Sequence, residues 1–362
     1  MNNYTCHCSN TLFFENTRCV ACNSDVGWCP ACQRLTGLIL SPNGTFQCGI
    51  RECQALLVKC HNYEVEHVCN RCLVANTNEV SRTGLCDYCR YNDTIPDLSV
   101  EGNRERWYRL EAAKRRLLYT LDFLGLSYGK AEDGIQPALS FDFKADTNFS
   151  GNQWKPMGDH EQVYTGHDHG KITINLQETE DVEREKLRVS FGEAHRTIVG
   201  HFRHEIGHYY WEMLIENKEE EDFIRLFGDY QNPTYSEALE RYYQEGPPNN
   251  WQENFISAYA TMHPWEDFAE TFAKYLAMVS VLDTARHNFA EVGIDPTRAE
   301  FMTMIKSYQN LGTMLNEMNR AMGLIDLMPE VLVQPVIEKL QFIHQILSAA
   351  RAGASFQASN HL

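Results

Sequence analysis

Several features are missing from this sequence of 362 residues, and each absence excludes a class of protein. No apolar run approaches about 18 residues, so we expect no transmembrane helix and no membrane partner. The first ten residues, MNNYTCHCSN, have neither a basic start nor an apolar core, so they do not predict a secretory signal peptide. Cysteine is absent after residue 89, although 13 cysteines precede that point. Any cysteine-based site is therefore confined to the N-terminal part.

Basic side chains are scarce relative to acidic ones. The chain has 32 Lys and Arg against 49 Asp and Glu, a formal net charge of −17. Residues 1–100 hold 7 basic and 9 acidic side chains, a net charge of −2, and the remaining residues carry the other −15. Contacts with phosphate need Lys and Arg, so nucleic acid is not an expected partner of the C-terminal part. The N-terminal part has no basic stripe either, and we expect it to bind a protein.

The cysteines occur in close pairs, such as CVAC, CPAC and CDYC, at the spacing of zinc ligands. We expect a cytoplasmic protein, whose thiols stay reduced, and this favours zinc over disulfides. A secreted, disulfide-linked module is the alternative. Two four-cysteine sites follow directly from the spacing: Cys6, Cys8, Cys19 and Cys22, then Cys29, Cys32, Cys48 and Cys53. Five cysteines compete for a third site, where spacing alone favours Cys69, Cys72, Cys86 and Cys89, with His61 as a further candidate ligand.

The stretch GHFRHEIGHYYWEML, Gly200–Leu214, predicts a helix with a metal site. His204 and His208 are four residues apart, so both imidazoles lie on one helical face and can bind one Zn²⁺. Glu205 lies about 100° further round the helix, where it can take a proton from a metal-activated water. An amphipathic helix with surface histidines is the alternative. We interpret the nearby His201 as a packing or supporting residue.

A catalytic zinc usually has a third protein ligand and an open fourth position. The segment WEDFAETFAKYL, which follows Pro264, has helical spacing of apolar residues and carries Glu266 and Glu270 on one face. Two carboxylates on an otherwise apolar helix are costly to bury without a cation. We expect Glu266 to bind the zinc and Glu270 to orient a histidine ligand through its other nitrogen. A solvated acidic face is the alternative.

These motifs resemble those of the gluzincin metallopeptidases. The local pattern is similar to that of anthrax lethal factor, in which a tyrosine precedes the third ligand by seven residues, as Tyr259 precedes Glu266 in YATMHPWE. The resemblance implies that the Tyr259 hydroxyl stabilises the oxyanion; it implies no role for His263, where that family often has Asn. Such folds bind the substrate to an edge strand, for which Gly170–Asn175, with Gly170, Ile172 and Ile174, is the candidate by resemblance and order.

The whole chain also resembles a bacterial family of zinc-binding metallopeptidases with an N-terminal zinc-ribbon domain. The segments LEAAKRRLLYTL, GKITINL, GHFRHEIGHYYW and HPWEDFAETFAKYL carry this resemblance. It implies that the third zinc site consists of Cys60, Cys69, Cys86 and Cys89, with Cys72 left as an additional thiol. We prefer this assignment to the one from spacing alone.

The predicted organisation is of the α+β class, with a zinc-ribbon domain over residues 1–98 and a mostly helical peptidase domain with a small sheet over residues 99–362. The polar segment Arg90–Asn103 forms the boundary, and a helix follows over residues 103–125. We interpret Lys114, Arg115 and Arg116 as the solvated face of that helix. ALSFDFKA and GKITINL predict strands, His167 and His169 are expected in a loop, and the tail from Ala354 is expected to be disordered.

The expected function is hydrolysis of peptide bonds in a protein or peptide substrate, with about one catalytic and three structural Zn²⁺ ions, by ligand count. Glu205 is the expected general base and Tyr259 the oxyanion donor. Two alternatives stay open: a catalytically silent multi-zinc adaptor, and a zinc amidohydrolase that acts on a non-peptide amide.

Overall fold

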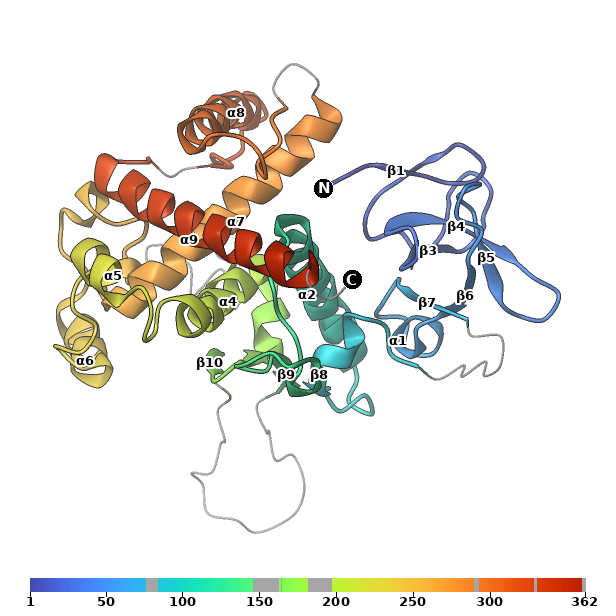
Figure 1. Cartoon of the computed structure of the whole chain (residues 1–362), viewed down its shortest axis with the longest axis horizontal. Coiled ribbons are helices and arrows are strands. Elements are labelled where there is room, and N and C mark those ends of the chain that lie inside the picture. Colours follow the sequence, from blue (N-terminus) through green and yellow to red (C-terminus); the bar gives the residue numbers. More distant parts are fainter. Residues whose placement is uncertain are drawn as a thin grey trace, which may run out of the picture.

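The structure is a computed structural model that describes residues 1–75, 84–145, 163, 165–181, 197–289, 293–328 and 331–359. The cysteine-rich residues form small sheets at one side, and the helices gather at the other, with helix α2 (Asn103–Leu124) next to the cysteine-rich part (Figure 1). The α+β class predicted from the sequence is confirmed: an N-terminal part with small sheets precedes a mostly helical C-terminal part.

Most strands of the N-terminal part form one antiparallel sheet. A hairpin of β1 (Tyr4–Thr5) and β2 (Thr11–Leu12) precedes it. The sheet has the order β3-β4-β5-β6-β7, and its strands are β3 (Val26–Cys29), β4 (Arg34–Leu40), β5 (Phe46–Cys48), β6 (Leu56–Lys59) and β7 (Cys72–Val74). The Trp28 amide donates to the Asn70 carbonyl oxygen at 2.8 Å, which brings β3 against β7. The short helix α1 (His61–Glu64) lies between β6 and β7.

A second sheet, of order β10-β11-β9-β8, belongs to the C-terminal part. Its strands are β8 (Asn92–Thr94), β9 (Ser140–Lys144), β10 (Gly166–Asp168) and β11 (Lys171–Asn175). The polar segment expected to form the domain boundary therefore contains a strand, because β8 pairs in parallel with β9. Phe141, Phe143, Ile172 and Ile174 are fully buried, so one face of this sheet packs into the core.

The helices of the C-terminal part are α2, α4 (Ile198–Leu214), α5 (Glu220–Phe227), α6 (Tyr235–Glu245), α7 (Pro264–Asn288), α8 (Phe301–Ala321) and α9 (Gln334–Ser359). Helix α2 agrees with the predicted helix and ends at Gly125, which adopts a left-handed conformation with φ of 65°. Helix α9 extends to Ser359, and the expected disorder of the tail from Ala354 stays a prediction. Residues 360–362 lie outside the described residues.

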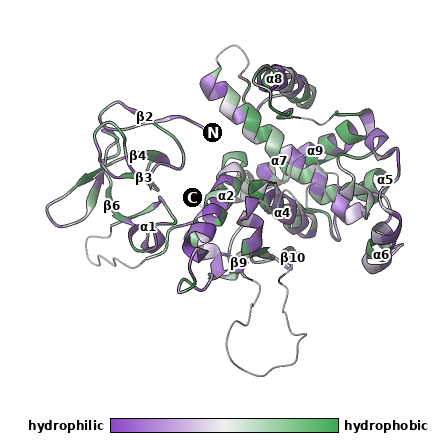
Figure 2. Cartoon of the chain, turned by 180° about the vertical axis from the view of Figure 1, so that it is seen from behind, coloured by the Kyte–Doolittle hydropathy of each residue, from purple (hydrophilic) through white to green (hydrophobic). Residues whose placement is uncertain are grey.

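Helices α4 and α7 approach each other closely at Gly207. A Cβ atom at this position would lie 2.9 Å from the Cα atom of Ala269. Buried side chains such as Phe268, Phe272 and Leu276 line the inner face of α7. Hydrophobic and hydrophilic residues both occur along α7 and α9 (Figure 2), as expected of helices with one buried face. The missing side chain of Gly207 thus lets the helix with the two histidines lie against the helix with the two glutamates.

The basic run on α2 is not the solvated face that the sequence predicted. Lys114 and Arg115 are buried, and only Arg116, with a side chain 43% exposed, lies partly in solvent as expected of this run. Lys114 forms a buried ion pair with Glu111 at 2.9 Å, and the Arg115 guanidinium donates to the carbonyl oxygen of Val68 at 2.6 Å. Arg115 therefore connects α2 with the cysteine-rich part. In the described part of the chain, no helix is long and apolar enough to cross a membrane.

Candidate metal centres

His204, His208 and Glu266 converge from helices α4 and α7. The Nε2 atoms of His204 and His208 lie 3.2 Å apart. The Oε2 atom of Glu266 lies 2.9 Å from the first of these nitrogens and 3.5 Å from the second. Zinc binds imidazole nitrogen and carboxylate oxygen at about 2.0–2.2 Å in tetrahedral geometry, so two ligand atoms should lie about 3.3 Å apart. The three observed separations bracket this value, and the residues fit one zinc ion.

Glu270 lies behind His204, away from the shared point. Its Oε1 atom is 2.6 Å from Nδ1 of His204. Burial lowers the pKa of His204, but the two adjacent carboxylates more than offset this and raise it well above its usual value. Burial also opposes ionisation of Glu266, yet the positive charges of His208 and His204 hold the pKa of Glu266 below its usual value. Zinc binds an ionised carboxylate and neutral imidazoles, so zinc binding at this centre would displace the protons that the histidines otherwise hold.

Glu205 is buried beside this group and does not belong to it. Burial raises the pKa of Glu205, and the charges of His204 and His208 oppose this rise. A carboxylate with a raised pKa is a stronger base than an exposed one, which suits proton transfer near neutral pH. The position agrees with the arrangement expected from the sequence.

Tyr259 and His263 precede Glu266 in the short connection to α7. Tyr259 lies in a 3-10 turn (Tyr259–Thr261), and its ring centroid is 6.1 Å from that of His204. His263, for which no role was expected, is the N-cap of α7. Its Nδ1 atom accepts a hydrogen bond from the Trp265 amide at 3.2 Å, and its Nε2 atom donates to the Tyr230 carbonyl oxygen at 3.1 Å. His263 thereby fixes the start of the helix that carries Glu266.

One tyrosine at this centre was not expected from any sequence pattern. Tyr235, the first residue of α6, donates a hydrogen bond to Oε1 of Glu266 at 2.9 Å. Tyr235 is 31 residues before Glu266 in a polar segment, with no pattern that relates it to the helix that carries His204 and His208. Only the folded arrangement brings its hydroxyl to the carboxylate.

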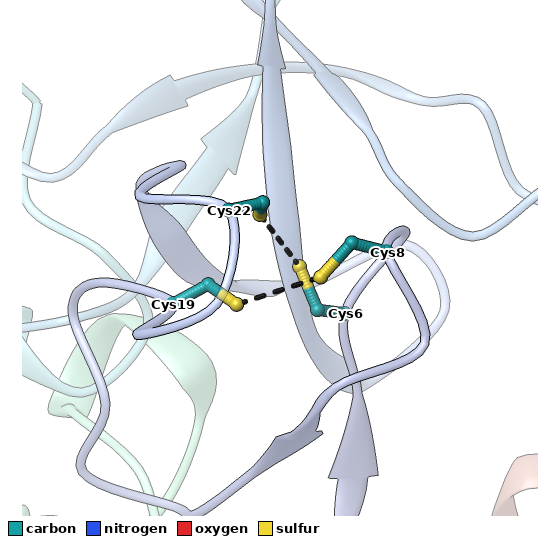
Figure 3. Close-up of side chains that lie close together, drawn as sticks. All are labelled: Cys6, Cys8, Cys19 and Cys22. Atoms are coloured by element: carbon teal, nitrogen blue, oxygen red, sulfur yellow. Dashed lines mark hydrogen bonds between the residues drawn. The ribbon is translucent and has the colours of Figure 1, made fainter.

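The first two cysteine sites form as the spacing predicts. In the first, the sulfur atoms are 3.7 Å apart for Cys6 and Cys22 and 3.6 Å apart for Cys8 and Cys19 (Figure 3). In the second, the pairs Cys29–Cys53 and Cys32–Cys48 are each separated by 3.8 Å. A tetrahedral zinc with Zn–S bonds of about 2.3 Å places sulfurs about 3.8 Å apart, whereas a disulfide needs about 2.05 Å. All 13 cysteines are free, and both groups fit zinc.

The third group consists of Cys60, Cys69, Cys86 and Cys89, whose sulfurs lie within 4.8 Å of one another. Cys69 and Cys86 are separated by 3.8 Å, and the Cys86 amide donates to the Cys60 sulfur at 3.3 Å. Cys72 is buried on β7 outside this group, against Gly27, where an added Cβ atom would lie 2.7 Å from its sulfur. The arrangement agrees with the assignment from family resemblance and not with that from spacing alone. His61 is not in the group either.

The candidate substrate strand does not lie at the edge of its sheet. Strand β11, with Ile172 and Ile174, pairs with β10 on one side and β9 on the other, so its backbone groups are already used. Gly170 lies in the turn before it, with φ of 84°. The expectation that Gly170–Asn175 is the edge strand is therefore wrong, because the hairpin places β10 there instead.

The other histidines near the centre are not among the metal-binding groups of the described residues. His167 lies on β10, in a strand and not the expected loop, with its ring stacked 6.3 Å from that of His208. Burial, with a smaller contribution from His208, lowers the pKa of His167 to about 3. His169 is exposed in the following turn and pairs with Glu212 at 3.0 Å. His201 is 2.9 Å from Glu178, and its role as a packing or supporting residue stays a prediction.

Comparison with known proteins agrees with these centres. Residues 103–346 match a family described as "Putative zinc-binding metallo-peptidase", and residues 3–100 match a zinc-ribbon domain. The chain belongs to this metallopeptidase family. Uncharacterized proteins of Mycobacterium bovis and of two Mycobacterium tuberculosis strains are each 36% identical to it over 360 residues, which covers 96% of this chain and 95% of theirs. No solved structure shows significant similarity to the chain.

Membership of this metallopeptidase family confirms the resemblance stated for the whole chain, and zinc is the metal that both matched regions imply. None of the matches concerns the lethal factor. The role of Tyr259, which depends on that resemblance, stays a prediction.

Proposed function

We propose that this protein is a zinc-dependent peptidase that hydrolyses peptide bonds. The observation that supports the proposal most strongly is the meeting of His204, His208 and Glu266 at tetrahedral separations of 2.9–3.5 Å. Three protein ligands leave a fourth position for water, as in catalytic zinc sites, whereas the cysteine groups supply four ligands each, as in structural sites. The expected content is thus one catalytic and about three structural zinc ions.

In this proposal, each residue around the centre has a separate role in the reaction. Zinc bound by the three ligands would polarise a peptide carbonyl and lower the pKa of a water molecule. Glu205 takes the proton of the attacking water and then gives it to the leaving amine. Tyr259 donates a hydrogen bond to the carbonyl oxygen as negative charge develops on it. Glu270 holds the His204 ring through Nδ1, so that Nε2 faces the metal.

We further propose that an extended peptide substrate pairs with β10. This strand ends the sheet order β10-β11-β9-β8, and it lies beside α4, where His167 stacks against His208. In the described ranges, no other strand pairs with its outer side. Backbone pairing with an edge strand binds peptides with little dependence on their side chains. A substrate on Gly166–Asp168 would lie next to the ligand histidines.

The zinc-ribbon part is proposed to recognise a protein, either the substrate or a partner, in the cytoplasm. Its near-neutral charge of −2 over residues 1–100 and its lack of a basic stripe argue against nucleic acid. Phe13 and Val20, in the part that holds the first cysteine group, are 62% and 91% exposed. Apolar side chains with this exposure are available for a protein contact.

A peptide library derived from a whole proteome tests the proposal. The zinc-loaded chain and the Glu205→Gln variant are incubated with the library, and new peptide termini are identified by mass spectrometry. Termini that appear with the unchanged chain alone would support a peptidase and give its sequence preference. Cleavage of non-peptide amides without new peptide termini would favour an amidohydrolase. No hydrolysis of either class, with the fourth zinc position closed by a further protein ligand, would favour a silent adaptor.

A further inference from the structure

Tyr235 is held over the proposed zinc centre from three directions. It begins α6, directly after Thr234, whose side chain caps the helix in a reciprocal arrangement with Glu237. The ring centroid of Tyr235 lies 5.4 Å from that of His263 and 5.8 Å from that of Trp265, both in edge-on geometry. The cap fixes where the helix starts, and the two rings fix where the phenol points. Its hydroxyl therefore reaches Glu266 from a defined direction.

The two oxygens of the Glu266 carboxylate have different surroundings. Oε2 lies 2.9 Å from Nε2 of His204 and 3.5 Å from Nε2 of His208, on the side where a metal would bind. Oε1 accepts the hydrogen bond of the Tyr235 hydroxyl at 2.9 Å. A carboxylate can bind a cation through one oxygen or through both. The hydroxyl occupies Oε1 and so favours binding through Oε2 alone.

We propose that Tyr235 is a positioning residue that keeps Glu266 a one-oxygen zinc ligand and leaves the fourth zinc position open. This inference rests on the proposed function only in taking Glu266 as the third zinc ligand. Without the hydroxyl, Oε1 would lose its donor and would turn toward the metal as a second carboxylate oxygen. Ala238 is the single buried side chain of helix α6. The hydrogen bond from Tyr235 to Glu266 is therefore an important contact between the first turn of this helix and the centre.

The test compares Tyr235→Phe with the unchanged chain and with Tyr243→Phe as a matched control. Phenylalanine keeps the ring contacts with His263 and Trp265, and Tyr243 lies on the same helix but is 66% exposed. A mild chelator first removes the most weakly held metal, which is then replaced by Zn²⁺ or Co²⁺ while the cysteine groups keep their zinc. Zinc affinity is measured by competition with a chelator, and the geometry by the visible absorption of Co²⁺.

We expect Tyr235→Phe to weaken zinc binding at this centre by about 10- to 100-fold, the range for loss of a group that orients a ligand. The Co²⁺ bands should lose intensity as the coordination number rises, and Tyr243→Phe should match the unchanged chain. Wild-type zinc affinity together with a wild-type Co²⁺ spectrum in Tyr235→Phe would overturn the proposal. These readouts need no turnover, so a chain that cleaves no peptide could still support the role of Tyr235. Conversely, failure here would leave cleavage that depends on Glu205 unaffected.

Discussion

His204 lies between the two carboxylates of helix α7. Its Nε2 atom is 2.9 Å from Oε2 of Glu266, and its Nδ1 atom is 2.6 Å from Oε1 of Glu270. One imidazole therefore contacts both glutamates with opposite nitrogens. His208 contacts Glu266 as well, at 3.5 Å, so only Glu266 faces both histidines. This relationship assigns the two carboxylates to different tasks, although they are a single helical turn apart.

The first prediction separates these tasks by zinc affinity. Glu266→Gln should lose most of the affinity of the catalytic centre, because a neutral amide replaces a charged ligand. Glu270→Ala should weaken binding by about 10- to 100-fold, since it removes the acceptor that orients His204. Competition titration against a chelator measures both. Normal zinc binding by Glu266→Gln together with loss of binding by Glu270→Gln would show that the two assignments are reversed.

The second prediction concerns Tyr259. A hydroxyl that donates to the developing oxyanion acts in the transition state and hardly in the ground state. Tyr259→Phe should lower kcat by about 10²- to 10³-fold, while KM, zinc content and thermal stability change little. Steady-state kinetics on a verified substrate provide the measurement. If Tyr259 only packs near His204, the variant will instead lose about 1 kcal/mol of stability and keep its kcat.

The third prediction distinguishes the two cysteines that competed for the third zinc site. Cys60→Ser should release one zinc ion and destabilise the N-terminal part, because Cys60 lies in the group with Cys69, Cys86 and Cys89. Cys72→Ala, a matched change at a buried cysteine outside that group, should keep the full zinc content. Elemental analysis of gently purified protein counts the ions. If Cys60→Ser keeps its zinc and Cys72→Ala loses one ion, the third site consists of Cys69, Cys72, Cys86 and Cys89, as spacing alone favours.

The fourth prediction uses the N-cap of α7. His263→Ala should cost about 1 kcal/mol of stability, whereas His263→Asn should keep the cap. Burial lowers the pKa of His263, so the unfolded chain binds a proton there at higher pH than the folded chain does. The stability that the neutral side chain contributes is complete above a pH of about 6.5 and is lost as the pH falls below it. Chemical denaturation between about pH 7 and pH 5 should show a smaller loss for His263→Asn than for the unchanged chain. Equal losses would contradict this account.

Sequence patterns with a fixed spacing predicted the metal-binding residues well. The interval of four between His204 and His208, the adjacent Glu205, and the cysteine pairs each depend on local geometry that the backbone determines. The structure places these groups as expected. The choice between Cys60 and Cys72 was different, because local spacing favours Cys72, whereas the fold places Cys72 on β7, paired with Lys59, and outside the group of sulfurs that includes Cys60.

Features that depend on tertiary pairing could not be read in the same way. Alternation in GKITINL predicted a strand but not its neighbours, and the hairpin with Gly166–Asp168 makes β11 an internal strand. Lys114 and Arg115 were predicted to lie on a solvated face because charged side chains are usually exposed. In the structure both are buried: Lys114 pairs with Glu111, and Arg115 donates to the carbonyl oxygen of Val68. Tyr235 donates to Glu266, which is 31 residues further along the sequence. Helical and strand periodicity relate only residues within one element, so they could not predict this contact.

The most direct test of peptide hydrolysis at this centre is the cleavage rate of Glu205→Gln at equal zinc occupancy. Glu205 is not one of the three residues that meet at the metal position, so the variant should keep the zinc content of the unchanged chain. Removal of the general base should abolish measurable hydrolysis of a peptide that the unchanged chain cleaves. Zinc content by elemental analysis and cleavage by mass spectrometry are measured on the same preparations. Full zinc occupancy with no new peptide termini is the predicted result, and wild-type cleavage by the zinc-loaded variant would contradict the account.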